Sequence, residues 1–137
     1  MIKIGNFEIE YDKNAPDAVM VKIETDKNGE VWLSKCDIAR VYGVFVQSVN
    51  AGLKSLAKTG DFDEYRDVRV EHFTYNGKDC SVDLYSLETI IALGFRMKGL
   101  KCEAFRKWAA RRLAESFEKK KRTVNLCKSG EKRNNWI

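Results

Sequence analysis

Residues 33–57, LSKCDIARVYGVFVQSVNAGLKSLA, decide the fold that we expect the rest of the chain to build around. Leu33 to Val44 is typical of a short helix that stops at Gly43, and Phe45 to Ala57 is typical of a second helix. The small Ala39 lets the second helix cross the first closely. Two helices joined by a tight glycine turn form the helix-turn-helix motif, which favours DNA binding over enzyme chemistry.

Spacing divides each of these helices into an inward and an outward face. Ser34 is a suitable N-cap for the first helix, whose inward face carries Ile38, Val41 and Tyr42. The inward face of the second helix carries Val46, Val49, Leu53 and Leu56. Its outward face holds the candidate DNA contacts Gln47, Ser48, Asn50 and Lys54. Gln and Asn suit adenine in the major groove, whereas Ser and Lys suit phosphate; the alternative is an ordinary solvated face.

A hairpin is predicted directly after the second helix. Asp67 to Tyr75 and Cys80 to Tyr85 have the composition of two strands, and Asn76-Gly77 tolerates the positive φ angles of a tight hairpin turn. A hairpin in this place corresponds to the wing of a winged helix. Lys78 at its tip is a candidate phosphate or minor-groove contact, or else a turn lysine that only improves solubility.

Strands are also predicted at the N-terminus. Phe7 to Tyr11 and Val19 to Glu24 alternate apolar and polar residues, with Pro16 in a loop between them. Asp26 to Gly29 is a turn signal, after which Glu30 to Leu33 is expected to pair back on the preceding strand. Trp32 is then expected to be a core anchor between sheet and helices.

Two further helices are predicted after the hairpin. The first runs from a Ser86 cap to Met97, and its inward residues are expected to be Leu87, Ile90, Ile91 and Phe95. The second runs from Lys101 to Lys121, with an apolar stripe interpreted as core: Phe105, Trp108, Ala109, Leu113 and Phe117. The sequence thus predicts one α+β, winged-helix-like domain, 1–118, comprising strands 1–33, helix-turn-helix 34–58, wing 67–85 and helices 86–118, followed by a basic polar tail, 119–137.

Positive charge is concentrated in the C-terminal part of the chain. From Arg96 onward, fourteen Lys and Arg residues stand against four Asp and Glu residues, whereas residues 1–95 are net acidic. This asymmetry indicates a basic surface able to meet phosphates, or else salt bridges to the acidic part. The candidate contacts in this region are Arg96, Lys98, Lys101, Arg106, Lys107 and Arg111.

Other classes of protein are disfavoured by what the sequence contains. No apolar run reaches the roughly 20 residues of a membrane span, and the N-terminus has no secretory core, so a cytoplasmic protein is expected. Four widely separated cysteines and one histidine favour reduced thiols over a metal site. No catalytic constellation surrounds His72, so we expect neither an enzyme nor a cofactor.

Several segments resemble RhuM-type proteins, a bacterial family named for a pathogenicity-island virulence protein. In chain order they are Val31–Ser34, Ile38–Val44, Lys58–Glu64, Tyr75–Lys78, Tyr85–Arg96 and Phe105–Ala109. The resemblance spans about Val19 to Phe117. This part of the chain is similar to the N-terminal conserved region of longer family members. The resemblance implies a DNA-binding protein and a role in transcription regulation.

The chain departs from that family at the start of the second helix. Family members carry polar and basic residues there, whereas this chain has the apolar pair Phe45-Val46 and no good N-cap. The alternative function is therefore a protein-interaction module, similar to phage antirepressor domains, that docks a partner through this edge. Expected partners are duplex DNA, another protein or a second copy in a homodimer.

Overall fold

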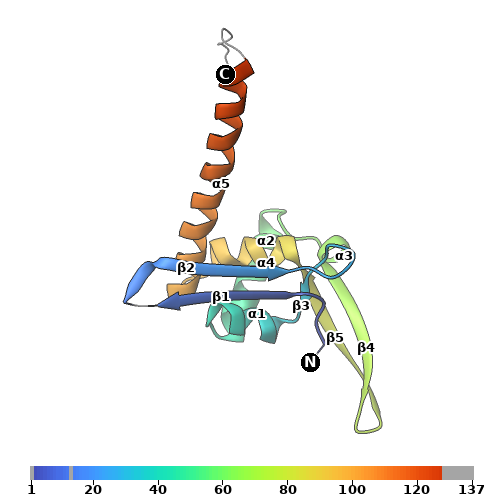
Figure 1. The fold of residues 1–137 in the computed structure, drawn as a ribbon. Helices are drawn as coiled ribbons and strands as arrows, with labels where there is room; N and C mark the ends of the chain where they lie inside the picture. Colours follow the sequence, from blue (N-terminus) through green and yellow to red (C-terminus); the bar gives the residue numbers. More distant parts are fainter. Residues whose placement is uncertain (1, 13, 128–137) are drawn as a thin grey trace.

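Two small antiparallel sheets and five helices form the described part of the chain, residues 2–12 and 14–127 of a computed structural model (Figure 1). The strands are β1 (Asn6–Asp12), β2 (Ala15–Glu24), β3 (Trp32–Leu33), β4 (Val68–Tyr75) and β5 (Lys78–Ser86). The helices are α1 (Lys35–Tyr42), α2 (Val46–Lys58), α3 (Glu64–Asp67), α4 (Leu87–Arg96) and α5 (Leu100–Cys127). The predicted mixed α+β class is confirmed.

The helix pair α1–α2 lies between two strands of one sheet in the sequence. This sheet has the order β3-β5-β4, so β5 is central and the helix pair connects its two outer strands. β4 and β5 form a hairpin with regular register from Val68↔Tyr85 to Tyr75↔Lys78. Its two-residue turn places Asn76 at φ 51° and Gly77 at φ 76°, which confirms the predicted hairpin turn.

The predicted ends of the helix pair are confirmed within two residues. The Ser34 hydroxyl accepts a hydrogen bond from the Asp37 backbone N–H at the start of α1. Gly43, at φ 64°, ends α1 in the left-handed conformation that an L side chain disfavours. Phe45 precedes α2 and gives it no side-chain cap, as its apolar character predicts. The buried hydrophobic residues of the pair are Ile38, Ala39, Tyr42, Val49, Leu53 and Leu56, and Asp37 and Gly52 are buried with them.

The predicted pairing of Glu30–Leu33 with the second strand is wrong. β2 pairs with β1, and Trp32 instead lies opposite Ser86 of β5 and Ile4. The Asp26 carboxylate accepts hydrogen bonds from the backbone N–H groups of Asn28 and Glu30, which closes a local loop rather than a strand-pairing turn. Trp32 is therefore only half-buried, with its indole N–H donating to Glu30, and is not the expected core anchor.

Pro16 lies inside β2 rather than in a loop before it. It falls where the β1–β2 register shifts between Glu10↔Met20 and Asp12↔Ala15. A proline is tolerated at such an irregularity because no regular ladder bond needs its missing N–H.

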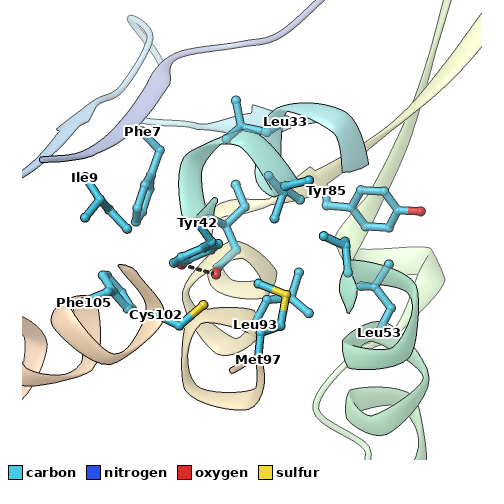
Figure 2. Packing of buried hydrophobic residues seen from close by; sticks show 14 of the residues in the cluster. Phe7, Ile9, Leu33, Tyr42, Leu53, Tyr85, Leu93, Met97, Cys102 and Phe105 are labelled. Atoms are coloured by element: carbon cyan, nitrogen blue, oxygen red, sulfur yellow. Dashed lines mark hydrogen bonds between the residues drawn. The ribbon is translucent and has the colours of Figure 1, made fainter. Parts of the chain in front are cut away.

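Three aromatic rings from distant parts of the chain meet in the core (Figure 2). Phe7 of β1, Tyr42 of α1 and Phe105 of α5 have ring centroids 5.7 to 6.1 Å apart. The Tyr42 hydroxyl donates a hydrogen bond of 2.7 Å to the Ile90 carbonyl of α4. Burial raises the pKa of Tyr42, and the adjacent Cys102 thiol raises it further, so the phenol stays neutral as a donor. The three rings join the N-terminal hairpin to α1 and α5.

The inward face of α4 differs from the predicted one. Ile90 and Leu93 are fully buried and Gly94 faces the core, whereas Phe95 is 51% exposed. A Cβ atom on Gly94 would lie 2.6 Å from Phe105 and 2.7 Å from the Tyr42 hydroxyl oxygen. The aromatic rings thus require a glycine at position 94. Because Gly94 faces the core, the next residue of the helix, Phe95, lies toward the surface.

The helix α5 extends beyond the body of the protein (Figure 1). Phe105 is buried and Trp108 is half-buried, but Leu113 is 61% and Phe117 is 62% exposed. The predicted core stripe is therefore wrong beyond Ala109, because β1, β2 and α4 cover only the first turns of α5. The helix continues to Cys127, so the predicted tail 119–137 begins inside it, and 128–137 lie outside the described residues.

A buried carboxylate joins the start of β4 to the start of α4. Asp67 is 2% exposed and accepts hydrogen bonds from the Arg66 guanidinium, the Asp63 backbone N–H and the Ser86 hydroxyl. Burial raises the pKa of Asp67, but these hydrogen bonds and the Arg66 charge outweigh it and hold that pKa below its usual value. Ser86 is also the N-cap of α4, so Asp67 fixes the base of the hairpin against that helix.

We predict that Gly94→Ala destabilises the protein although alanine favours a helix. The added methyl group has no room between Phe105 and Tyr42, and overpacking of this kind costs about 1–3 kcal/mol against a helix-propensity gain of about 1 kcal/mol. Gly52→Ala in α2 is the matched control, because its Cβ would meet two flexible side chains, Leu93 at 2.7 Å and Met97 at 3.4 Å, rather than two packed aromatic rings. Urea unfolding measures both variants. A Gly94→Ala protein as stable as Gly52→Ala would contradict this account.

We predict that Asp67→Asn costs about 2 kcal/mol at neutral pH, because an amide places a donor against the donors that now surround the carboxylate. Since the folded pKa is depressed, the contribution of Asp67 is full above the unfolded value of 3.8 and is lost as pH falls through the folded value. Chemical unfolding should show a gap between wild type and variant that narrows below pH 3.8. The exposed Asp83→Asn is the control.

Candidate nucleic-acid interface

The outward face of α2 is polar and free of acidic side chains. None of its thirteen residues is Asp or Glu. Gln47 and Lys54 are exposed, and Ser48 and Asn50 are partly exposed, so all four side chains predicted to contact DNA reach the surface of one helix. This face can offer hydrogen-bond donors and acceptors without repelling phosphate.

A groove separates α2 from the β4–β5 hairpin. Asn50 and Lys54 line it on the helix side, and Val70 and Asp83 line it on the hairpin side, with a volume of about 710 Å³. Asp83 on the hairpin and Glu64 on α3 add negative charge to the groove, whereas Lys54 on α2 adds positive charge. Phosphate is therefore favoured on the helix side of the groove and disfavoured on the hairpin side.

A second groove continues this concave surface past the start of α1. It has a volume of about 820 Å³ and shares Lys35 and Asp83 with the first groove. Phe73 and Tyr75 line its hairpin side. Lys35 lies where the two grooves meet, with its ammonium group 5.9 Å from the centre of the Tyr85 ring. Lys35 is not among the predicted contacts, because its position directly after the Ser34 cap does not indicate that it faces the hairpin.

The hairpin and α5 project from the body in opposite directions (Figure 1). Lys78 is exposed at the first residue of β5, beside the hairpin turn. Lys107 and Arg111 are exposed on α5, where Lys107 forms an ion pair of 3.6 Å with Glu103. The structure therefore does not gather the predicted basic contacts of α5 with the hairpin tip into one surface.

Two of the predicted DNA contacts hold the helices together. Arg96 donates hydrogen bonds to Ser55 and Thr59 of the end of α2 and lies 3.4 Å from the Asp61 carboxylate. Arg106 donates to the carbonyls of Gly94 and Met97, each at 3.0 Å, at the end of α4. The alternative of a salt bridge to the acidic part of the chain thus describes Arg96, whereas Arg106 has a structural role of another kind, with carbonyl oxygens as its partners. Lys98 is exposed in the connection between α4 and α5, and Lys101 is partly exposed in the first turn of α5.

Three exposed aromatic side chains lie directly before α2 or in the two grooves. Phe45, directly before α2, is 81% exposed, whereas Val46 is partly buried against the core. Tyr65 and Tyr75 are 99% and 65% exposed, and both line the grooves. Neither tyrosine is a predicted contact, because Tyr65 lies in the short helix α3 and Tyr75 ends β4, and neither position indicates a groove in the sequence.

Potential metal ligands in the described residues do not form a cluster. Among them, no group of three or more His, Cys, Asp or Glu residues is arranged to hold a metal ion. His72 is exposed on β4, and of the described cysteines Cys102 is buried whereas Cys36 is exposed rather than in the core. No helix in this part of the chain has the length and apolar character that crossing a membrane requires.

Comparisons with known protein families, curated proteins and solved structures find no match for this chain. The resemblance to RhuM-type proteins stays a prediction from the residues that carry it. Arguments about function therefore come from the geometry of the site.

We predict that Arg106→Ala destabilises the protein by about 1–2 kcal/mol, because it leaves two helix-end carbonyls without their charged donor. The neighbouring Lys107→Ala removes the same charge from an exposed position and should change stability by less than about 0.5 kcal/mol. Urea unfolding of both variants measures the difference. Equal effects would mean that the carbonyl contacts of Arg106 contribute nothing to the fold.

Proposed function

We propose that this chain is a winged helix-turn-helix protein that binds duplex DNA without catalysis. In this proposal α2 is the recognition helix and the β4–β5 hairpin is the wing. The order of elements supports it: a short strand, two helices with a tight glycine turn, and a hairpin whose second strand is central in the sheet. The resemblance to RhuM-type bacterial proteins agrees with a role in transcription regulation.

The observation that carries the proposal is the acid-free outward face of α2 beside the hairpin. An α-helix fits the major groove, where the amide of Gln47 or Asn50 can form two hydrogen bonds to adenine. Phe45 adds an exposed apolar group at the start of the helix, which suits the methyl group of thymine. The departure from the family at this position thus changes the kind of base contact that is expected.

Three lysines are placed to bind the phosphates that flank such a groove. Lys54 lies on α2, Lys35 lies between the two grooves, and Lys78 lies beside the hairpin turn. The carboxylates of Asp83 on the hairpin and Glu64 on α3 repel phosphate from the groove. DNA is therefore expected to approach along α2 and the hairpin tip rather than enter the groove.

We predict that the protein binds random duplex DNA at low salt, and that affinity falls as salt rises because phosphate contacts release counterions. Lys54→Ala should lower the magnitude of the slope of log K against log salt by about one. Fluorescence anisotropy with a labelled duplex measures both quantities. Lys22→Ala, at an exposed lysine of β2, is the matched control and should leave the slope unchanged.

The proposal fails if duplex DNA does not bind at low salt, or if binding does not depend on salt. Asn50→Ala and Gln47→Ala test base reading separately, because each should reduce discrimination between selected and random duplexes more than it reduces affinity for random DNA. Uniform loss on all duplexes would assign these two side chains to the phosphates.

A second candidate function is a protein-interaction module of antirepressor type. The 81% exposure of Phe45 favours it, because a large apolar side chain at a helix start is a typical anchor in a protein interface. Phe45→Ser separates the two candidates. It should leave salt-dependent binding to random DNA intact if DNA is the partner, and should abolish partner capture if a protein is.

A further inference from the structure

The central strand β5 lacks a neighbouring strand along most of one edge. β3 pairs with β5 only at Tyr85 and Ser86, because the chain turns into α1 at Ser34. In the described part of the chain, no strand pairs with residues 78–84 of β5 on this side. Figure 1 shows this edge facing the N-terminus and α1, with β4 on the other side of β5. Over most of its length β5 therefore has one open edge.

The register of the hairpin shows which backbone groups point to this open edge. The two-residue turn makes Tyr75↔Lys78 a hydrogen-bonded pair. Along an antiparallel ladder such pairs alternate with pairs that exchange no hydrogen bonds. The N–H and C=O groups of three β5 residues therefore point away from β4, namely those of Asp79, Ser81 and Asp83.

Pairing at the base of the hairpin agrees with this alternation. Trp32 of β3 exchanges backbone hydrogen bonds of 2.8 and 2.9 Å with Ile4, on the side away from β5. The backbone groups of Leu33 therefore face Tyr85, which is two residues beyond Asp83 in the same alternating set. A strand that continued the β3 ladder would meet the three outward-pointing residues of β5 in turn.

The groove of about 820 Å³ between the hairpin and the start of α1 runs beside this edge. Its volume is in the range of clefts that bind ligands. Phe73 and Val82, which lie on one face of the hairpin, give the groove an apolar side together with Ile2. Lys35 and Arg40 line it from α1. The open edge is thus flanked by a cleft that can accept side chains.

The positive charges of this groove already have negative charges beside them. Arg40 donates a hydrogen bond of 2.8 Å to the buried carboxylate of Asp37. Lys35 shares the groove with Asp83. A neutral polar residue therefore suits the position opposite Asp83 in an added strand.

The charge pattern of the edge favours a basic strand over a second copy of this chain. Asp79 is exposed near the turn, Lys78 lies on the other face of the hairpin, and Thr74, opposite Asp79, is neutral. A Lys or Arg opposite Asp79 would form a favourable cross-strand pair. A second copy paired antiparallel about Ser81 would instead place Asp79 of each copy opposite Asp83 of the other, and like charges in that position are destabilising.

We propose that β5 accepts an extended segment of a partner protein as an added strand, antiparallel to β5 and in line with β3. Three of its residues exchange backbone hydrogen bonds with β5: two polar residues opposite Asp83 and Ser81, and a basic residue opposite Asp79. The two residues between them are apolar and lie on the side of Phe73 and Val82. This inference goes beyond the proposed DNA binding and does not depend on it.

Fluorescence anisotropy of the full chain with the labelled, end-blocked peptide Gly-Thr-Val-Thr-Val-Lys-Gly tests the proposal. This peptide should bind with a Kd below about 1 mM. N-methylation of the threonine opposite Ser81 should weaken binding about tenfold, because that N–H points to β5. N-methylation of the valine opposite Cys80 is the matched control, since its N–H points away. Absence of binding, or equal effects of the two methyl groups, overturns the proposal.

A proline on each edge of the hairpin tests the site from the side of the protein. Ser81→Pro removes an outward-pointing N–H but no ladder bond to β4, so the hairpin should form and peptide binding should fall about tenfold. His72→Pro is the matched control, because His72 lies opposite Ser81 and its N–H points to the outer edge of β4. Circular dichroism checks that both variants fold. Unchanged binding to a folded Ser81→Pro protein contradicts the proposal, and the methylated peptides decide it if this variant does not fold.

Charge exchange tests the direction of the added strand. Asp79→Lys should weaken binding of the lysine peptide about two- to fivefold, because it places like charges opposite each other. A peptide with Glu in place of Lys should bind Asp79→Lys more tightly than it binds the wild type, by a similar factor. If this exchange has no effect although the peptide binds, the antiparallel register is wrong.

Discussion

The close approach of Tyr42 and Phe105 at Gly94 is the contact on which the other packing of this fold depends. Because position 94 has no side chain, a ring from α1 and a ring from α5 can both rest on α4. Phe7 closes this cluster from β1 and so attaches the N-terminal hairpin to it. A two-stranded hairpin is barely stable alone in water, so its order relies on this attachment.

The same helix, α4, also sets the position of α2. Leu93 lies against Gly52 of α2, where a Cβ atom would come within 2.7 Å of it. At the other end of this contact, Arg96 of α4 is hydrogen-bonded to Ser55 and Thr59. The orientation of the outward face of α2 is thus set by residues of α4 that are not part of the candidate interface. Sequence reasoning had assigned Arg96 to DNA because its charge is visible and its partners are not.

Local signals predicted the elements well because their causes are local. Ser34, Gly43, Ser86 and Asn76-Gly77 act within a few residues of themselves, and each occupies the cap or turn that its chemistry implies. Trp32 and Phe95 were misplaced because strand pairing and the aromatic cluster are decided by residues far along the chain. Leu113 was misplaced for another reason: periodicity identifies an apolar face, but does not indicate where the covering body ends.

The two hydrogen bonds from Arg106 to backbone carbonyls fix the position of α5 on α4. They span the short connection at Met97 and Gly99, where a free loop would otherwise act as a hinge. Arg96 then links α4 to the end of α2, so α5, α4 and α2 form one mechanical unit. A change in the position of α5 on α4 would therefore act, through α4, on the helix that carries the candidate DNA contacts.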